Sequence, residues 1–173
     1  MKLTQWLKKL LGIDKPDKLP RRDFLTAVEA EDTATVLGIL KTESERGNPE
    51  AMAALAALYS TGRGGVEQSD AEAALWYRQA AVRGYVDAQA LLGLALATGG
   101  GVEPNPEEAA YWLYLAATAG HEAALEWLAD LVFQAPDVIG KHFSSTDLAK
   151  LLKAKGINEM RKHSARMRPP DES

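Results

Sequence analysis

One passage of this chain occurs twice, with the second copy 36 residues after the first. From Gly64 the sequence reads GGVEQSDAEAALWYRQAAVRG, and from Gly100 it reads GGVEPNPEEAAYWLYLAATAG. Trp76 therefore returns as Trp112, inside the same pattern of alanines. A fixed period of about 20–50 residues is typical of architectures in which each unit packs only on its neighbours. The chain is predicted to fold as such a stack.

Glycines set the boundaries of the predicted units. They stand at Gly47, Gly84, Gly120 and Gly156, so successive spacings are 37, 36 and 36 residues. A glycine just after a helix adopts the left-handed conformation without strain, and it commonly ends the helix. The first three are each followed, four residues later, by an alanine that lets neighbouring helices approach closely: Ala51, Ala88 and Ala124. The pattern predicts a helix on each side of every glycine.

Helix starts are marked by short polar residues that can accept a hydrogen bond from the first helical turn. We expect N-caps at Asp32, Asn48, Ser69 and Asn105. Ser69 with Glu72, and Asn105 with Glu108, have the spacing of a capping box, in which each side chain bonds the other residue's backbone N–H. The sequence also predicts a first helix at 23–30, and a degenerate third unit with helices at 121–134 and 146–155.

Charge distinguishes two basic segments from an acidic body between them. Residues 1–22 carry a charge of +5, residues 150–168 carry +6, and the body at 23–149 carries −13. We expect a basic amphipathic helix and Pro-containing linker at 1–22, the repeats at 23–156, and a basic helix and tail at 157–173. The amphipathic helix has an apolar face that would dock on the repeats or on a partner, or would bind weakly to an anionic membrane surface. That face consists of Leu3, Trp6, Leu7, Leu10 and Leu11.

The repeated unit resembles the Sel-one-like repeat family, a relative of the tetratricopeptide repeat. The residues that carry the resemblance are Gly65, Val66, Trp76, Tyr77, Ala80, Ala81, Gly84, Gly101, Val102, Trp112, Ala116, Ala117 and Gly120. The resemblance implies an all-α, right-handed α-solenoid of antiparallel helix pairs, with a period of 36–37 residues. In such a solenoid the first helix of each pair lines a concave groove. Family members commonly act as adaptors and bacterial signalling scaffolds, and some resemble immunity proteins.

No residue pattern indicates catalysis, a metal site or a cofactor. The chain has no cysteine, and none of its three histidines shares a helical turn with another. The glycines at 99–101 are not followed by the Lys-Ser/Thr of a phosphate-binding loop. The sequence therefore predicts a protein that is not an enzyme, with no small-molecule substrate.

The concave groove is predicted to bind a partner. The groove positions that we expect to contact it are Met52, Gln89, Leu91, Leu94, Glu126, Trp127 and Asp130. Two alternatives remain open: a terminal helix covers these residues, or Leu91 and Trp127 belong to the core between repeats.

The leading functional hypothesis is a bacterial, cytoplasmic scaffold that binds a protein or peptide. The acidic body favours a basic partner and argues against nucleic acid. One alternative is an immunity protein that neutralises a secreted toxin. The other is a tether held by residues 1–11 at the inner membrane surface.

Overall fold

The computed structural model describes residue 24, residues 26–28, residue 30 and residues 32–135. The predicted N-terminal helix at 1–11, the second helix of the third unit at 146–155 and the basic C-terminal helix lie outside these residues. The division into segments at 1–22, 23–156 and 157–173 therefore stays a prediction.

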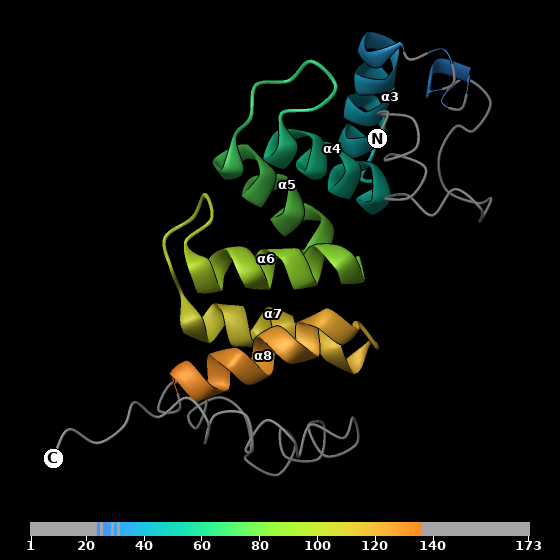
Figure 1. Cartoon of the computed structure of the whole chain (residues 1–173). Helices are drawn as coiled ribbons and strands as arrows, with labels where there is room; N and C mark the ends of the chain where they lie inside the picture. The colour runs from blue at the N-terminus through green and yellow to red at the C-terminus, as the bar shows by residue number, and fades with distance from the viewer. Residues whose placement is uncertain (1–23, 25, 29, 31, 136–173) are drawn as a thin grey trace, which may run out of the picture.

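Six helices of 13 residues each follow one another down the described part of the chain (Figure 1). They are α3 (Thr33–Glu45), α4 (Pro49–Thr61), α5 (Asp70–Val82), α6 (Val86–Thr98), α7 (Pro106–Thr118) and α8 (Glu122–Gln134). Each packs against the next, and α6 also packs against α8. This arrangement confirms the predicted all-α solenoid, and before α3 the described residues 24 and 26–28 are also helical.

The turns α3–α4, α5–α6 and α7–α8 share one geometry. The glycines that end α3, α5 and α7 have φ of 89°, 82° and 97°, as predicted for Gly47, Gly84 and Gly120. In the first turn the N–H of Gly47 donates to Ser44 O at 2.9 Å, and that of Asn48 donates to Glu43 O at 3.0 Å. This bond pair is a Schellman motif, and the other two turns repeat it. The residue after each glycine is also the N-cap of the next helix, which fixes a tight turn.

The four predicted N-caps are confirmed. Each cap side chain accepts a hydrogen bond from the first helical turn, at Asp32, Asn48, Ser69 and Asn105. The capping boxes are only half formed, because the backbone N–H groups of Ser69 and Asn105 donate to the preceding helix instead, at 2.9 Å in both cases. The acceptors are Tyr59 O and Leu96 O, which occupy equivalent places in α4 and α6. These bonds tie each loop back to the helix before it.

The core is built from alanines and leucines, so that adjacent helices approach closely. Within α4 every residue from Ala51 to Leu58 is buried. Leu55, Leu92 and Leu128, which stand at equivalent positions of the three units, are each 0% exposed. A second cluster forms where Phe24, Ala27 and Val28 cover the face of α4 that contains Ala54.

The helices α6 and α7 approach each other closely at Gly93. A Cβ built on Gly93 would lie 2.7 Å from Leu113 Cγ and 3.1 Å from the Leu113 backbone nitrogen. Such a contact is too short to persist, so Leu113 and its helix would have to move. Leu113 stands where the first unit has Tyr77.

Gly93→Ala is therefore expected to lower the free energy of unfolding by about 1–2 kcal/mol, because overpacking exceeds the gain in helix propensity. The control is Gly38→Ala in α3, where a Cβ would have no atom within 4 Å. That change should raise stability by about 0.5–1 kcal/mol. Urea unfolding followed by circular dichroism measures both. If both substitutions changed the free energy of unfolding equally and in the same direction, the close packing of α6 on α7 would be contradicted.

Candidate functional site

Two of the seven predicted groove residues are buried, so the prediction is wrong for them. Met52 is 1% exposed and belongs to the main core. Gln89 is 9% exposed, and its Nε2 donates to Ala81 O at the end of α5 at 3.3 Å. Gln89 therefore satisfies a backbone carbonyl between two helices. Neither side chain is available to a partner.

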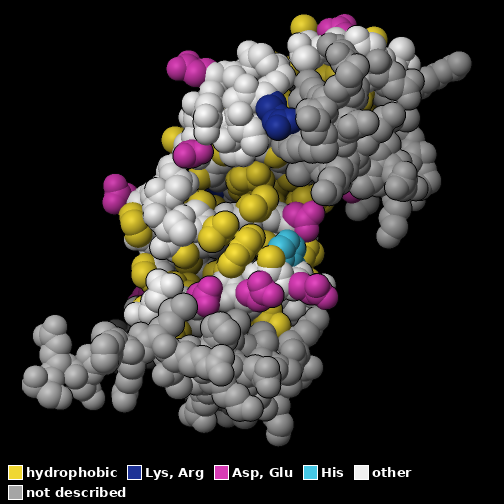
Figure 2. Space-filling view, viewed as in Figure 1, with side chains coloured by type: hydrophobic (Ala, Val, Ile, Leu, Met, Phe, Trp, Pro, Cys, Tyr) yellow, Lys and Arg dark blue, Asp and Glu magenta, His cyan; other side chains and the backbone are white. Residues whose placement is uncertain are grey.

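The other five residues reach the surface on α6 and α8. Leu91, Leu94 and Trp127 are half-buried, whereas Glu126 and Asp130 are exposed. Leu91 and Trp127 also pack against the main core, so each side chain is partly core and partly surface. We call these five residues the α6–α8 surface. Figure 2 shows hydrophobic side chains gathered over α6, bordered by a row of acidic side chains where α8 lies.

His121 joins the starts of α6 and α8 beside this surface. Its Nδ1 accepts a hydrogen bond from the Ala124 N–H at 3.1 Å and so caps α8. Its Nε2 lies 3.7 Å from a carboxylate oxygen of Asp87, in the first turn of α6. Its ring centroid is 6.1 Å from that of Trp127. Sequence reasoning placed His121 after a helix-ending glycine but missed its role as a cap. The signal was its position, equivalent to the recognised cap Asn48.

All the charged side chains of α4, α6 and α8 are acidic. Their sequences contain five acidic residues and no lysine or arginine: Glu50, Asp87, Glu122, Glu126 and Asp130. Among the arginines that the structure describes, Arg78 lies on α5, Arg46 and Arg83 are the C-caps of α3 and α5, and Arg63 lies in the loop after α4. The α6–α8 surface is thus apolar at its centre and negative at its border.

On α5 and α7, an ion pair links successive units. Both terminal nitrogens of the Arg78 guanidinium, Nη1 and Nη2, donate to the Glu108 carboxylate, the Nη2 bond at 3.3 Å. Trp112 Nε1 donates to the same carboxylate at 3.1 Å. The Arg78 guanidinium is the main reason that the pKa of Glu108 lies below its usual value of 4.5. These bonds make Glu108 a structural residue between α5 and α7.

Glu108→Gln is expected to lower the free energy of unfolding at pH 7 by up to about 1 kcal/mol, because the ion pair is partly exposed. Since the folded protein has the lower pKa, the Glu108 contribution is present above pH 4.5 and is lost as the pH falls through that lower pKa. Urea unfolding of both proteins between pH 7 and acid pH measures this. Glu72→Gln, the equivalent change one unit earlier, is the control. A stability difference that persists in acid would contradict the ion-pair origin.

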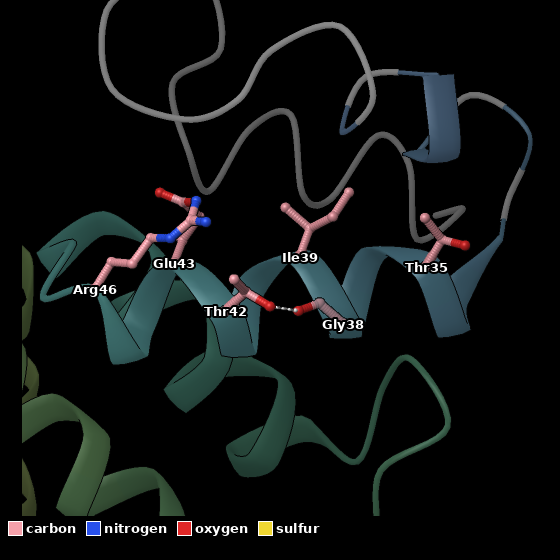
Figure 3. Close-up of a pocket in the computed structure, with 6 residues that line it drawn as sticks. All are labelled: Thr35, Gly38, Ile39, Thr42, Glu43 and Arg46. Carbon is pink, nitrogen blue, oxygen red and sulfur yellow. Dashed lines mark hydrogen bonds and ion pairs between the residues drawn. The ribbon is translucent and has the colours of Figure 1, made fainter.

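The described part of the chain shows a hollow of about 360 Å³ along α3, far from the α6–α8 surface (Figure 3). The residues that line it all come from this one helix or its C-cap, and include Thr35, Ile39 and Arg46. Such a shallow face does not enclose a ligand. Among the described residues there is also no group of three or more His, Asp or Glu side chains placed to hold a metal ion. No described helix is long and apolar enough to span a bilayer.

Comparison with known proteins identifies Sel1 repeats in this chain. The model of the Sel1 repeat matches residues 49–85 and 86–121. A Sel1 repeat protein from Oxalobacter formigenes is 35% identical and has a TM-score of 0.54, and the match covers 56% of this chain and 72% of that one. The protective antigen c5321 of uropathogenic Escherichia coli, which has an SLR fold, is 26% identical with a TM-score of 0.62, over 75% of this chain and 29% of that one.

A third structure supports the fold alone. Helicobacter pylori cysteine rich protein B is 21% identical with a TM-score of 0.55, over 73% of this chain and 98% of that one. No curated protein sequence matches the chain significantly. The two matched repeats coincide with the pairs α4–α5 and α6–α7, each with its closing turn.

Proposed function

Because the chain belongs to the Sel1-repeat family, whose members generally mediate protein–protein interactions, we propose that it is a scaffold that binds a partner protein or peptide on the α6–α8 surface. The fold alone does not specify this role, since function depends on the site that a fold presents. The proposal therefore rests on the residues of that surface.

The observation that carries the proposal is the presence of large apolar side chains at positions that the repeat does not require to be large. Leu91 and Leu94 are half-buried on α6, whereas the equivalent residues of α4 are Ala54 and Ala57, both buried. Trp127 stands at the position of Leu91 one unit later and is also half-buried. Alanine suffices for packing at these positions. Exposed apolar surface of this kind marks interaction sites.

The experiment is capture of a partner by the full chain at low salt, comparing the wild type with Leu91→Glu/Trp127→Glu. The variant is expected to lose the partner, because carboxylates at the centre of the surface would be desolvated on binding. A milder variant, Leu94→Ser, should weaken capture while leaving the fold intact, which circular dichroism checks.

The matched control places the same charges on the other helices. Leu75 and Tyr111 are 56% and 51% exposed, and they occupy equivalent positions on α5 and α7. Leu75→Glu/Tyr111→Glu should leave capture unchanged. Capture that survives in both folded α6–α8 variants but is lost in the control would move the binding site to the α5–α7 face.

The acidic border also favours the immunity-protein alternative, in which this surface covers the active site of a basic toxin. Co-expression with a toxin encoded beside this gene tests it. Suppressed toxicity that depends on Trp127 would support this role, and toxicity unaffected by the protein would exclude that toxin as the partner.

A further inference from the structure

The acidic residues of α8 repel one another within the part of the chain that the structure describes. Glu122 and Glu126, and then Glu126 and Asp130, are pairs of like charges four residues apart on one helix. Each such pair is unfavourable, since side chains at this spacing are neighbours on the helix surface. Within the described part of the chain none of the three forms an ion pair, in contrast to Glu108 with Arg78 and Glu43 with Arg46. Unbalanced charge is therefore concentrated on the helix that carries Trp127.

The apolar and acidic groups form one surface. Asp87 and Leu91 are four residues apart and therefore share a face of α6. Asp87 lies beside His121, whose ring contacts Trp127 on α8. On α8, Trp127 lies between Glu126 and Asp130, and both of these side chains are exposed. An apolar strip is thus bordered by carboxylates from two helices.

We propose that the α6–α8 surface selects a basic amphipathic segment of a partner, with apolar side chains on Leu91, Leu94 and Trp127 and lysines or arginines against the carboxylates. This inference rests on the proposed function and specifies the chemistry of the partner. A segment of this type relieves the repulsion on α8 and buries the apolar strip in one event. The half-buried indole of Trp127 adds a face on which a cation beside Asp130 packs favourably.

The test uses a defined probe, a fluorescein-labelled peptide of ~14 residues in which leucines form one helical face and lysines the other. A second peptide has glutamate in place of every lysine. Both are titrated against the full chain by fluorescence anisotropy. The lysine peptide should bind, and its affinity should fall steeply as salt screens the charges. The glutamate peptide should not bind.

The deciding variant neutralises the border, with Asp87→Asn, Glu126→Gln and Asp130→Asn. It should weaken binding of the lysine peptide about tenfold or more. The control variant removes three exposed acids elsewhere, with Glu67→Gln, Glu72→Gln and Glu103→Gln, and so has the same net charge. This control should bind the lysine peptide nearly as well as the wild type does, because only the carboxylates of the border lie close to the lysines.

The possible results distinguish a surface that does not select basic segments from a surface that is not the binding site at all. If the lysine peptide does not bind, or if both triple variants weaken it equally, the surface does not select a basic segment. If the border variant binds like the wild type while Leu91→Glu/Trp127→Glu does not, the surface binds apolar groups and only the inference about charge is wrong. If neither variant affects binding, the proposed site is wrong as well. If a full chain with Lys2, Lys8 and Lys9 replaced by glutamine binds the lysine peptide much more tightly than the wild type does, the chain's own basic N-terminal segment competes for the surface, and the assignment to a partner is overturned.

Discussion

Gly101→Ala is expected to lower the free energy of unfolding by about 2–4 kcal/mol, whereas Gly65→Ala should cost only about 1 kcal/mol. The two glycines are equivalent residues of successive units, and their φ angles are 75° and 77°. The cost of a side chain in the left-handed conformation is therefore the same for both. The two glycines differ only in the atoms that surround them.

The difference arises because the loop between α6 and α7 packs against the start of α5. A Cβ on Gly101 would lie 2.2 Å from the carbonyl carbon and oxygen of Asp70 and 2.5 Å from the Ala71 nitrogen, whereas one on Gly65 would have no atom within 4 Å. Backbone atoms of a helix cannot rotate aside, so the loop or α5 must move. Urea unfolding of the two variants measures the difference. Equal losses of stability would mean that the loop does not contact α5.

Leu92→Ala is expected to destabilise the protein by about 2–5 kcal/mol, because it removes apolar contacts and leaves a cavity in a core that cannot fully collapse. Leu92 is 0% exposed and lies in the main cluster, among residues of successive units. The matched control is Leu75→Ala on α5. Leu75 is 56% exposed, so the same change there should alter stability by no more than about 0.5 kcal/mol.

The measurement for this pair is again urea unfolding, with the slope of the transition compared between variants. In a linear stack each unit contacts only its neighbours, so a weakened second unit can uncouple the ends of the stack and lower the slope. A loss below about 1 kcal/mol for Leu92→Ala would contradict its place at the centre of the core.

Local signals predicted the helices well. The glycines at 47, 84 and 120 end helices in the left-handed conformation, and the four polar caps accept the expected bonds. These features depend on residues within a few positions of each other, so the sequence shows them directly. The same local pattern did not show that Ser69 and Asn105 donate to the preceding helix, because that bond depends on how the loop folds back.

Side-chain burial was harder to predict, since it depends on which helices are neighbours. Met52 and Gln89 had the spacing of groove residues, but Met52 belongs to the main core and Gln89 is buried against the end of α5. Leu91 and Trp127 were assigned either to the groove or to the core. In the structure each side chain packs against the core and is also partly exposed at the surface. His121 caps α8 with a side chain that is uncommon in that role, so its type gave no indication.

The most direct measurement for the central claim is photo-crosslinking from single positions of the full chain. A photoreactive phenylalanine analogue replaces Leu94 on the α6–α8 surface in one protein and Leu75 on α5 in another. Position 94 is expected to yield a covalent adduct with a partner protein that is lost with Trp127→Glu, and position 75 is expected to yield none. Adducts from position 75 alone, or equally from both positions, would contradict a binding surface formed by α6 and α8.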